Sequence, residues 1–292
     1  MRRSALSLLR CPACQGSLNL EGEEDVAEQS GRLLCSCGES FEIREGVPNL
    51  VFPRLQGFTL EDADSYDELI EWMGRLLNED AGAARSRAVD LLDVGPGARL
   101  LEVACGPGPN FPPLLKTIGA KGELHAFDIS PDMMRVAREK LPSDATNVEL
   151  SLANGLHLPF ADDSFDALLH IGTLNRFDDT RRALAEMARV VKVGGKVVAG
   201  DEGIAPWLAV TEYGLLLDKF GALFRGQPPL AAVPPTAREV RLQWLFGDAY
   251  YLIDFRVGRS ARTLNIDVPL PGRNETVRDV LEKKARAPTD SV

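Results

Sequence analysis

The stretch LLEVACGPGPNFPPL, residues 100–114, decides the fold of this chain. An apolar run passes through the acidic residue Glu102 and ends in a turn that contains Gly106 and Gly108. Because glycine has no side chain, a ligand can approach the backbone of such a turn closely. A buried strand followed by a glycine-containing turn is typical of nucleotide-binding α/β sheets, and the neighbouring sequence decides which ligand the turn holds.

Strands and helices alternate after this turn. A helix is expected to begin at Ser130 and Pro131, and a second helix over 178–195 is expected to end at Gly194 and Gly195. The alternation predicts an α/β fold, a Rossmann-like, doubly wound and mostly parallel sheet covered by helices on both faces. In such sheets ligands bind beyond the carboxyl ends of the strands. The predicted strands are the apolar runs at 98–104, 123–129, 147–153, 165–171 and 196–201.

The remaining segments divide the chain further. Residues 53–90 are polar and favour helix, which predicts a helical linker or lid. The aromatic-rich segment 203–248 is expected to be an insertion that covers the ligand edge of the sheet. Two strand-like runs, 249–258 and 261–272, are expected to close the sheet as an antiparallel hairpin. The main domain is therefore expected over 91–275. Residues 276–292 are expected to be a frayed C-terminal tail.

Four of the five cysteines lie in the first 37 residues. Cys11 and Cys14 form a CxxC pair, and Cys35 and Cys37 form a CxC pair that is one residue shorter than the usual second knuckle. Two such turns bring four thiolates to one tetrahedral zinc ion. Residues 1–52 have too little core to fold alone, so we predict a structural zinc ribbon there. The alternative is an extension with four thiols that bind no metal.

Composition and charge limit the classes of partner. The formal net charge is −10, so the averaged field repels polyanions and disfavours nucleic acid as a partner. No apolar run approaches the roughly 20 residues that a membrane span needs. The N-terminus is basic, but its apolar patch is short and Arg10 stands before Cys11 where a signal peptidase needs a small residue. We therefore expect a cytoplasmic protein.

The residues around the turn distinguish between two nucleotide-like ligands. Asp128 ends the second strand, twenty residues after Gly108, where a carboxylate accepts both hydroxyl hydrogen bonds of a ribose. Phe111 follows the two glycines and leaves no room for the close packing of a dinucleotide fingerprint. Glu102 is unfavourable beside a pyrophosphate but suits a ligand with an ammonium and a sulfonium. The balance favours S-adenosylmethionine over a dinucleotide.

Four motifs follow one another along the main domain. They are LLEVACGPGPN (100–110), AFDISPDMMRVAREK (126–140), LANGLHLPFADDSFDALL (152–169) and ALAEMARVVKVGGKVV (183–198). With these motifs, residues 98–201 resemble a class I S-adenosylmethionine-dependent methyltransferase of the methyltransferase-11, UbiE-like kind. A cysteine-rich ribbon before such a domain is similar to the arrangement in a ribosomal-RNA guanine methyltransferase family and in bacterial methyltransferases of unassigned substrate.

The resemblance implies a donor site for S-adenosylmethionine, with S-adenosylhomocysteine as product. Glu102 would lie under the methionine amino group, Asp128 would bind the ribose, and Asn154 would lie near the adenine amino group, where the family commonly has Asp. Ile129 and Met133 would contact the adenine. The full implied set is Glu102, Ala104, Gly106, Gly108, Asn110, Asp128, Ile129, Met133, Asn154, Gly155, Leu156 and His170.

The resemblance also suggests where the methyl acceptor binds. His170 ends a strand at the place where the transferred methyl group points, so it is the candidate base or substrate contact. A packed strand-end imidazole without a catalytic role is the alternative. The apolar 203–248 segment suits a hydrophobic or aromatic small molecule, although a packing or homodimer helix is an alternative use. The candidate acceptor contacts are Asn175, Asp201, Trp207 and Tyr213.

Three functional hypotheses follow. The first is S-adenosylmethionine-dependent methyl transfer to a small, apolar or aromatic molecule. The second is methylation of an RNA base, which the ribbon favours and the net charge disfavours. The third is an S-adenosylmethionine-binding protein that does not methylate, either a regulator or a rearrangement catalyst that uses the sulfonium as a fixed charge.

Overall fold

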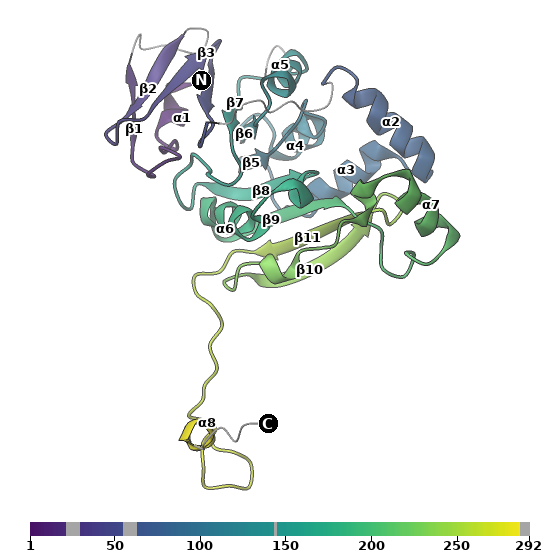
Figure 1. The fold of residues 1–292 in the computed structure, drawn as a ribbon. Helices are drawn as coiled ribbons and strands as arrows, with labels where there is room; N and C mark the ends of the chain where they lie inside the picture. The colour runs from purple at the N-terminus through teal and green to yellow at the C-terminus, as the bar shows by residue number, and fades with distance from the viewer. Residues whose placement is uncertain (22–29, 55–62, 143–144, 287–292) are drawn as a thin grey trace. The chain divides into compact units, whose positions relative to one another are not determined.

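The computed structural model describes residues 1–21, 30–54, 63–142 and 145–286. The chain forms two compact units, residues 1–259 and residues 260–292 (Figure 1). In the described residues, no helix has the length and apolar character needed to cross a membrane.

An eleven-stranded sheet forms the centre of the first unit, in the order β1-β2-β3-β4-β7-β6-β5-β8-β9-β11-β10. The strands from β4 through β9 in this order are parallel neighbours, and β11 pairs antiparallel with β9. From β5 the chain adds strands first on one side and then on the other, so a crevice lies at the carboxyl end of β5. The bounds are β1 Leu18–Glu21, β2 Gly31–Cys35, β3 Ser40–Arg44, β4 Val47–Leu50, β5 Arg99–Val103, β6 Glu123–Asp128, β7 Val148–Ala153, β8 Phe165–Ile171, β9 Val191–Glu202, β10 Arg238–Leu245 and β11 Tyr250–Arg256.

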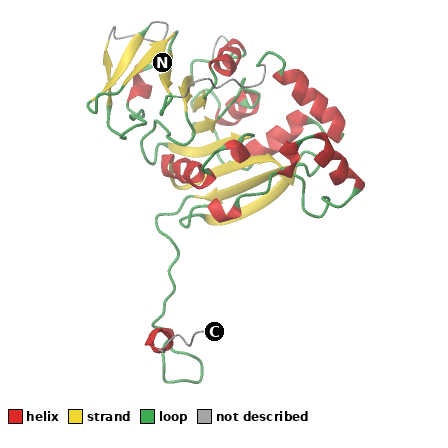
Figure 2. Cartoon of the chain, in the orientation of Figure 1, coloured by secondary structure: helices red, strands yellow, loops and turns green. Residues whose placement is uncertain are grey.

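Helices cover both faces of this sheet (Figure 2). One face packs against α6 and the N-terminal segment in a core that contains Val103, Phe160 and Leu184. The other face packs against α2, α3, α4, α5 and α7 in a second core. The doubly wound fold expected from the sequence is therefore confirmed. The helices are α1 Arg3–Leu6, α2 Tyr66–Leu77, α3 Ala81–Asp90, α4 Phe111–Ile118, α5 Pro131–Glu139, α6 Thr180–Val190 and α7 Glu212–Phe220, with short 3₁₀ turns at Leu174–Arg176, Ala222–Arg225 and Leu230–Ala232.

The N-terminal cysteine-rich segment extends the central sheet. Its last strand, β4, runs parallel to β7, with Asn49 opposite Leu152 and Leu50 opposite Ala153. Leu50 is fully buried in the core that this segment shares with the main domain. The sequence predicts the ribbon but not this pairing, because a four-residue strand carries no signal for its partner.

The closing hairpin lies earlier in the chain than predicted. Its strands are β10 and β11, and residues 261–272 form no strand. Phe246, Gly247 and Asp248 take positive φ angles in the turn between the two strands. A Gly-Asp pair is typical of such a hairpin turn, so the sequence contains a signal for it at 247–248. Because β10 belongs to the sheet, the expected insertion 203–248 is shortened to the residues before Arg238.

The helix predicted over 178–195 is also shorter than expected. It begins after Asp179, whose side chain accepts from Arg182 N, and it ends at Val190. Val191 then enters β9 and pairs with Phe165 of β8. β-branched residues at 190, 191 and 193 favour the extended pairing, so the strand begins before the two glycines.

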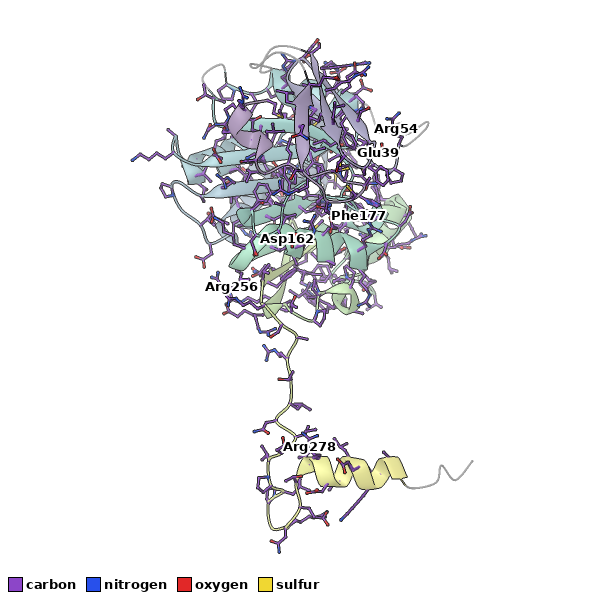
Figure 3. The ribbon with its side chains drawn as sticks, turned by 90° about the vertical axis from the view of Figure 1, so that its left-hand side faces the viewer. Glu39, Arg54, Asp162, Phe177, Arg256 and Arg278 are labelled. Atoms are coloured by element: carbon purple, nitrogen blue, oxygen red, sulfur yellow. The ribbon has the colours of Figure 1, made fainter. Side chains whose placement is uncertain are left out.

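The described part of the second unit, residues 260–286, contains one helix, α8 Val277–Arg286, which carries Arg278 (Figure 3). In this unit, Pro269 and Thr276 form an isolated antiparallel β-bridge, and Arg278 Nε donates to Asp267 Oδ1 at 2.6 Å. The boundary at residue 259 lies before the expected boundary at 275, and the described part of the expected tail is helical. Residues 287–292 of that tail lie outside the described residues.

Candidate functional site

The turn after β5 has the backbone shape that its sequence predicts. Ala104, Gly106 and Gly108 have φ angles of 52°, 55° and 79°. A Cβ atom on Gly108 would lie 2.5 Å from the ring of Phe111, so this position requires glycine. A Cβ atom on Gly106 would meet no atom within 4 Å. The backbone therefore borders open space at Gly106, as close approach of a ligand requires.

Asp128 joins the end of β6 to this turn. Its Oδ2 accepts from Gly106 N and its Oδ1 accepts from Ser130 N, both at 2.9 Å. Burial raises the pKa of Asp128, and the amides of Ser130, Gly106 and Ile129 oppose that rise. Each carboxylate oxygen has a second lone pair, so the fixed carboxylate can still accept from a diol.

A buried polar chain lies beneath the turn. Asn110 Nδ2 donates to Glu102 Oε1 at 2.7 Å, and Arg85 donates to Asn110 Oδ1 at 2.9 Å. Glu102 is 1% exposed, and no described residue hydrogen-bonds its Oε2. Burial raises the pKa of Glu102 to about 7. A buried carboxylate oxygen without a partner is costly, so this atom fits a ligand cation such as an ammonium group.

One cavity of about 290 Å³ connects the turn to the helices that precede β5. We call the lining residues at the ends of β5 and β6 and on the segments that follow them the donor half, and the remaining lining residues the acceptor half. The donor half is lined by Ala104, Cys105, Gly106, Pro109, Asn110, Asp128 and Met133. The acceptor half is lined mainly by Tyr66, Leu69, Ile70, Trp72, Met73, Arg85, Ile171, Gly172, Thr173, Arg176, Glu202, Phe220, Leu223, Phe224, Leu245, Phe246, Tyr250 and Leu252.

The structure separates the predicted donor residues into two groups. Ala104, Gly106, Asn110, Asp128 and Met133 line the cavity. Glu102 lies behind Asn110, to which it is hydrogen-bonded. Besides Glu102, the predicted residues that do not line this cavity are Gly108, Ile129, Asn154, Gly155, Leu156 and His170.

The loop after β7, which holds three of these residues, is internally fixed. Asn154 Oδ1 accepts from Leu156 N at 3.0 Å, and Asn154 Nδ2 donates to Phe52 O at 3.3 Å. A Cβ atom on Gly155 would lie 2.6 Å from the ring of Phe177. The Asn154 amide therefore shapes this loop, and its contact with an adenine stays a prediction.

His170 lies on the sheet face away from the cavity. Its imidazole is 0% exposed, and its Nδ1 lies 2.9 Å from Val103 O. Burial lowers the pKa of His170 to about 4. No described residue hydrogen-bonds its Nε2, and its ring packs against Phe177 at 5.5 Å between centroids. The following residue, Ile171, borders the cavity instead.

At the end of β9, as at the end of β8, two neighbouring residues face opposite sides of the sheet. Asp201 accepts from Asn175 N and from Glu202 N, and Asn175 Oδ1 accepts from the Tyr251 hydroxyl at 2.6 Å. Burial, together with the neighbouring Glu202 carboxylate, raises the pKa of Asp201 to about 9. Asn175 and Asp201 thus lie together in a structural network outside the cavity lining. Their sequence neighbours Arg176 and Glu202 line the cavity.

The two predicted aromatic acceptor contacts lie elsewhere. Trp207 is 59% exposed and packs edge-on against Trp244. The Tyr213 hydroxyl donates to Gly247 O at 2.5 Å, which fixes the β10–β11 turn. Neither residue lines the cavity. The sequence could have identified Glu202, because alternate residues of a strand face the same side. Tyr66, Arg85 and Tyr250 lie on other elements, and no local sequence pattern shows that these elements pack near the turn.

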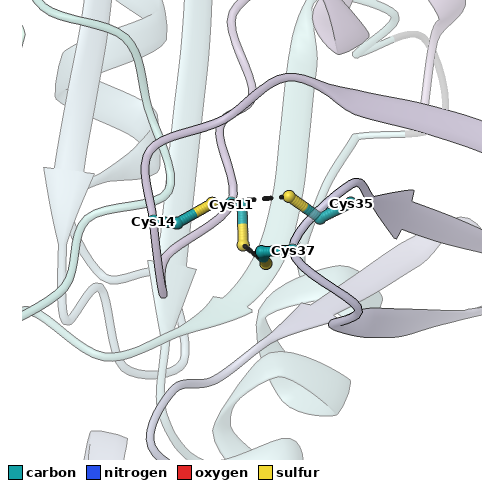
Figure 4. Close-up of side chains that lie close together, drawn as sticks. All are labelled: Cys11, Cys14, Cys35 and Cys37. Atoms are coloured by element: carbon teal, nitrogen blue, oxygen red, sulfur yellow. Dashed lines mark hydrogen bonds between the residues drawn. The ribbon is translucent and has the colours of Figure 1, made fainter.

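The four N-terminal cysteines converge (Figure 4). Their sulfur atoms all lie within 4.8 Å of one another, with Cys11 to Cys37 at 3.8 Å and Cys14 to Cys35 at 3.5 Å. Tetrahedral Zn–S bonds of about 2.3 Å place sulfurs roughly 3.8 Å apart. The Cys37 backbone amide lowers the pKa of Cys35 to about 7, whereas burial raises the pKa of Cys11 to about 12. The four residues therefore fit a zinc ion.

The cysteine-rich segment also contacts the loop after β7. Leu9 forms an antiparallel bridge with Phe160. Backbone and side-chain groups of this segment also hydrogen-bond residues 158–161, which follow the turn at Asn154. The hydrogen bonds are Arg10 N to Pro159 O (2.9 Å), Ala161 N to Leu8 O (2.9 Å) and Gln15 Nε2 to Leu158 O (3.3 Å).

Comparison with known proteins identifies the class of the central domain. The family model described as "Methyltransferase domain" matches residues 101–199, about a third of the chain. These residues therefore match a methyltransferase domain, as the sequence predicted.

The relatives extend this identification. A demethylmenaquinone methyltransferase from Bacillus cytotoxicus is 37% identical over 40% of this chain and 49% of its own length. One from Desulfitobacterium hafniense is 34% identical over 40% and 47%. A Haemonchus contortus phosphoethanolamine N-methyltransferase 2, solved with S-adenosyl-L-methionine, shares the fold with a TM-score of 0.53 and 12% identity, over 70% of this chain and 62% of that chain. This chain spans about half the length of the curated relatives it matches.

Proposed function

We propose that this protein transfers a methyl group from S-adenosylmethionine to a small, mainly apolar molecule. The observation that carries the proposal is one cavity with two unlike ends. Its donor half includes the fixed Asp128 carboxylate and Asn110, which hydrogen-bonds the buried Glu102, and no described residue hydrogen-bonds Glu102 Oε2. Its acceptor half is mostly aliphatic and aromatic, as a hydrophobic acceptor requires.

The residues of the donor half would bind and orient the donor. Bound there, S-adenosylmethionine supplies an electrophilic methyl group on a sulfonium. Glu102 would accept from its ammonium group and Asp128 from its ribose diol, while the Gly106 backbone leaves room for close approach. Because displacement from a sulfonium needs little more than alignment and exclusion of water, these positioning contacts supply most of the catalysis.

The acceptor itself is proposed from the relatives. Their name indicates methylation of demethylmenaquinone, an apolar quinone. We propose a molecule of similar size and polarity as the substrate here. The acceptor half supports this because Trp72, Phe220, Phe224 and Phe246 line it.

We further propose that Cys11, Cys14, Cys35 and Cys37 hold one structural zinc ion. Four thiolates at these distances leave no open coordination position, so the metal would stabilise the N-terminal segment. Free thiols in place of disulfides favour a reducing, cytoplasmic compartment.

Label transfer tests the proposed function. The protein is incubated with S-adenosylmethionine carrying a tritiated methyl group, together with a lipid-soluble extract or with total RNA. We expect label in the organic phase and equimolar S-adenosylhomocysteine. Label in RNA would instead support the RNA alternative. Tight S-adenosylmethionine binding without any S-adenosylhomocysteine would support a non-methylating binder.

A further inference from the structure

We infer that Glu202, held in place by the Tyr250 hydroxyl, binds a hydrogen-bond-donating group of the methyl acceptor. This inference rests on the proposed function and adds a specificity-determining residue to it. Glu202 is the last residue of β9 and lines the cavity, whereas the side chain of its neighbour Asp201 joins the network around Asn175.

The contact that fixes Glu202 comes from the adjacent strand. Tyr250 begins β11 and lies opposite Glu202 in the antiparallel pairing. Its hydroxyl donates to Glu202 Oε1. Burial raises the pKa of Tyr250 well above its ordinary value, so this phenol remains a proton donor across the physiological range. One carboxylate oxygen is thereby oriented. The Asp201 carboxyl group also hydrogen-bonds the Glu202 side chain, and the lone pairs of the Glu202 carboxylate that remain can accept from a ligand.

The surroundings of Glu202 explain why a ligand donor is needed. Ile171, Leu245 and Leu252 line the same part of the cavity. A carboxylate against apolar walls is unfavourable unless hydrogen bonds compensate for its lost hydration. The other polar groups of the acceptor half are Tyr66, Arg85, Thr173 and Arg176, and Arg85 is bound to Asn110 and Tyr66. A hydroxyl or protonated amine on the acceptor would add a further donor to Glu202, beside Tyr250 and Asp201.

The same position gives Glu202 a chemical role when the acceptor loses a proton. The bond between methyl carbon and sulfur breaks, and its electron pair stays on sulfur as S-adenosylhomocysteine forms. The acceptor atom forms the new bond to the methyl carbon. Its hydroxyl proton passes to the Glu202 carboxylate, and Tyr250 acts as a positioning residue for that carboxylate.

Paired probes test the inference on the full chain saturated with S-adenosylhomocysteine. The probes are 1,5-dihydroxynaphthalene, which donates hydrogen bonds, and 1,5-dimethoxynaphthalene, which does not. Calorimetry measures both affinities for the wild type, Glu202→Gln, Tyr250→Phe and the control Glu212→Gln. Glu212 is an exposed glutamate on α7 outside the cavity lining.

We expect the wild type and Glu212→Gln to prefer the diol by about tenfold or more, the range of a hydrogen bond to a charged group. Glu202→Gln should reduce that preference to about twofold, and Tyr250→Phe should reduce it partly. All four proteins should bind S-adenosylhomocysteine equally. An undiminished preference in Glu202→Gln, or a wild type that binds neither probe or both alike, overturns the inference. Failure of the wild type to bind S-adenosylhomocysteine overturns the proposed function instead.

Discussion

The two halves of the cavity are built in different ways. The donor half uses the backbone of one turn and the ends of β5 and β6, all between residues 102 and 133. The acceptor half collects side chains from α2, α3, the segment after β8, the end of β9, α7 and the closing hairpin. A short contiguous motif therefore encodes the donor site, whereas the acceptor site depends on how distant elements pack. Four substitutions sharpen this contrast.

The largest effect is expected at Asp128. Asp128→Ala removes the carboxylate that joins the turn to β6 and that would bind the ribose. Loss of hydrogen bonds to a charged group should lower the affinity for S-adenosylhomocysteine by about a hundredfold, measured by calorimetry. The control Asp132→Ala alters an exposed carboxylate on α5 and should leave the affinity unchanged. Equal affinities in both variants would contradict the donor assignment.

Glu102 should make donor binding depend on pH. Burial raises the pKa of Glu102 to about 7 in the unliganded protein. Only the ionised carboxylate attracts an ammonium group. Affinity for S-adenosylhomocysteine should therefore be constant above about pH 7 and fall by up to tenfold per unit below it. Glu102→Gln should bind about tenfold more weakly at pH 8 and lose this acid dependence. A pH dependence that persists in Glu102→Gln would assign it to another group.

The cysteine cluster should affect donor binding only indirectly. Cys35→Ser or removal of zinc by a chelator should lower the unfolding free energy by about 4 kcal/mol, as loss of a structural metal does. Because the segment binds residues 158–161, S-adenosylhomocysteine affinity should also fall, by about threefold. Ser36→Ala, at an exposed position between two of the cysteines, is the control. An unchanged melting temperature in Cys35→Ser would argue against a bound metal.

The smallest effect is expected at Trp207. Its ring is exposed and packs on Trp244, outside the cavity lining. Trp207→Ala should change the affinity for 1,5-dihydroxynaphthalene by less than about twofold, measured with S-adenosylhomocysteine bound. A tenfold loss would return this residue to the acceptor site.

Neighbouring residues of a strand face opposite sides of the sheet, and this explains most of the difference between the predicted acceptor contacts and the residues that line the cavity. The sequence places polar residues at the carboxyl ends of β8 and β9, and the structure has them there. Which of two neighbours faces the cavity depends on register, and a shift of one residue exchanges the faces. The predicted acceptor contact Asp201 hydrogen-bonds Asn175, whereas its neighbour Glu202 lines the cavity. His170 and Ile171 differ in the same way.

Features that depend on contacts between distant parts of the chain could not be predicted from the sequence either. The turn from Ala104 to Gly108, the Asp128 position and the five parallel strands follow from local patterns and match the structure. The register of β4 beside β7 and the approach of Tyr66 and Arg85 to the turn depend on tertiary packing. The hairpin was misplaced because residues 261–272 alternate like a strand, yet Leu264 there is 86% exposed. Alternation without a buried partner does not make a strand.

Calorimetric titration of S-adenosylhomocysteine into the full chain tests the central claim most directly. The donor half of the cavity predicts one binding site per chain, with affinity that falls below about pH 7 and is about a hundredfold lower in Asp128→Ala. No detectable binding of S-adenosylhomocysteine or S-adenosylmethionine at pH 8 would contradict the account.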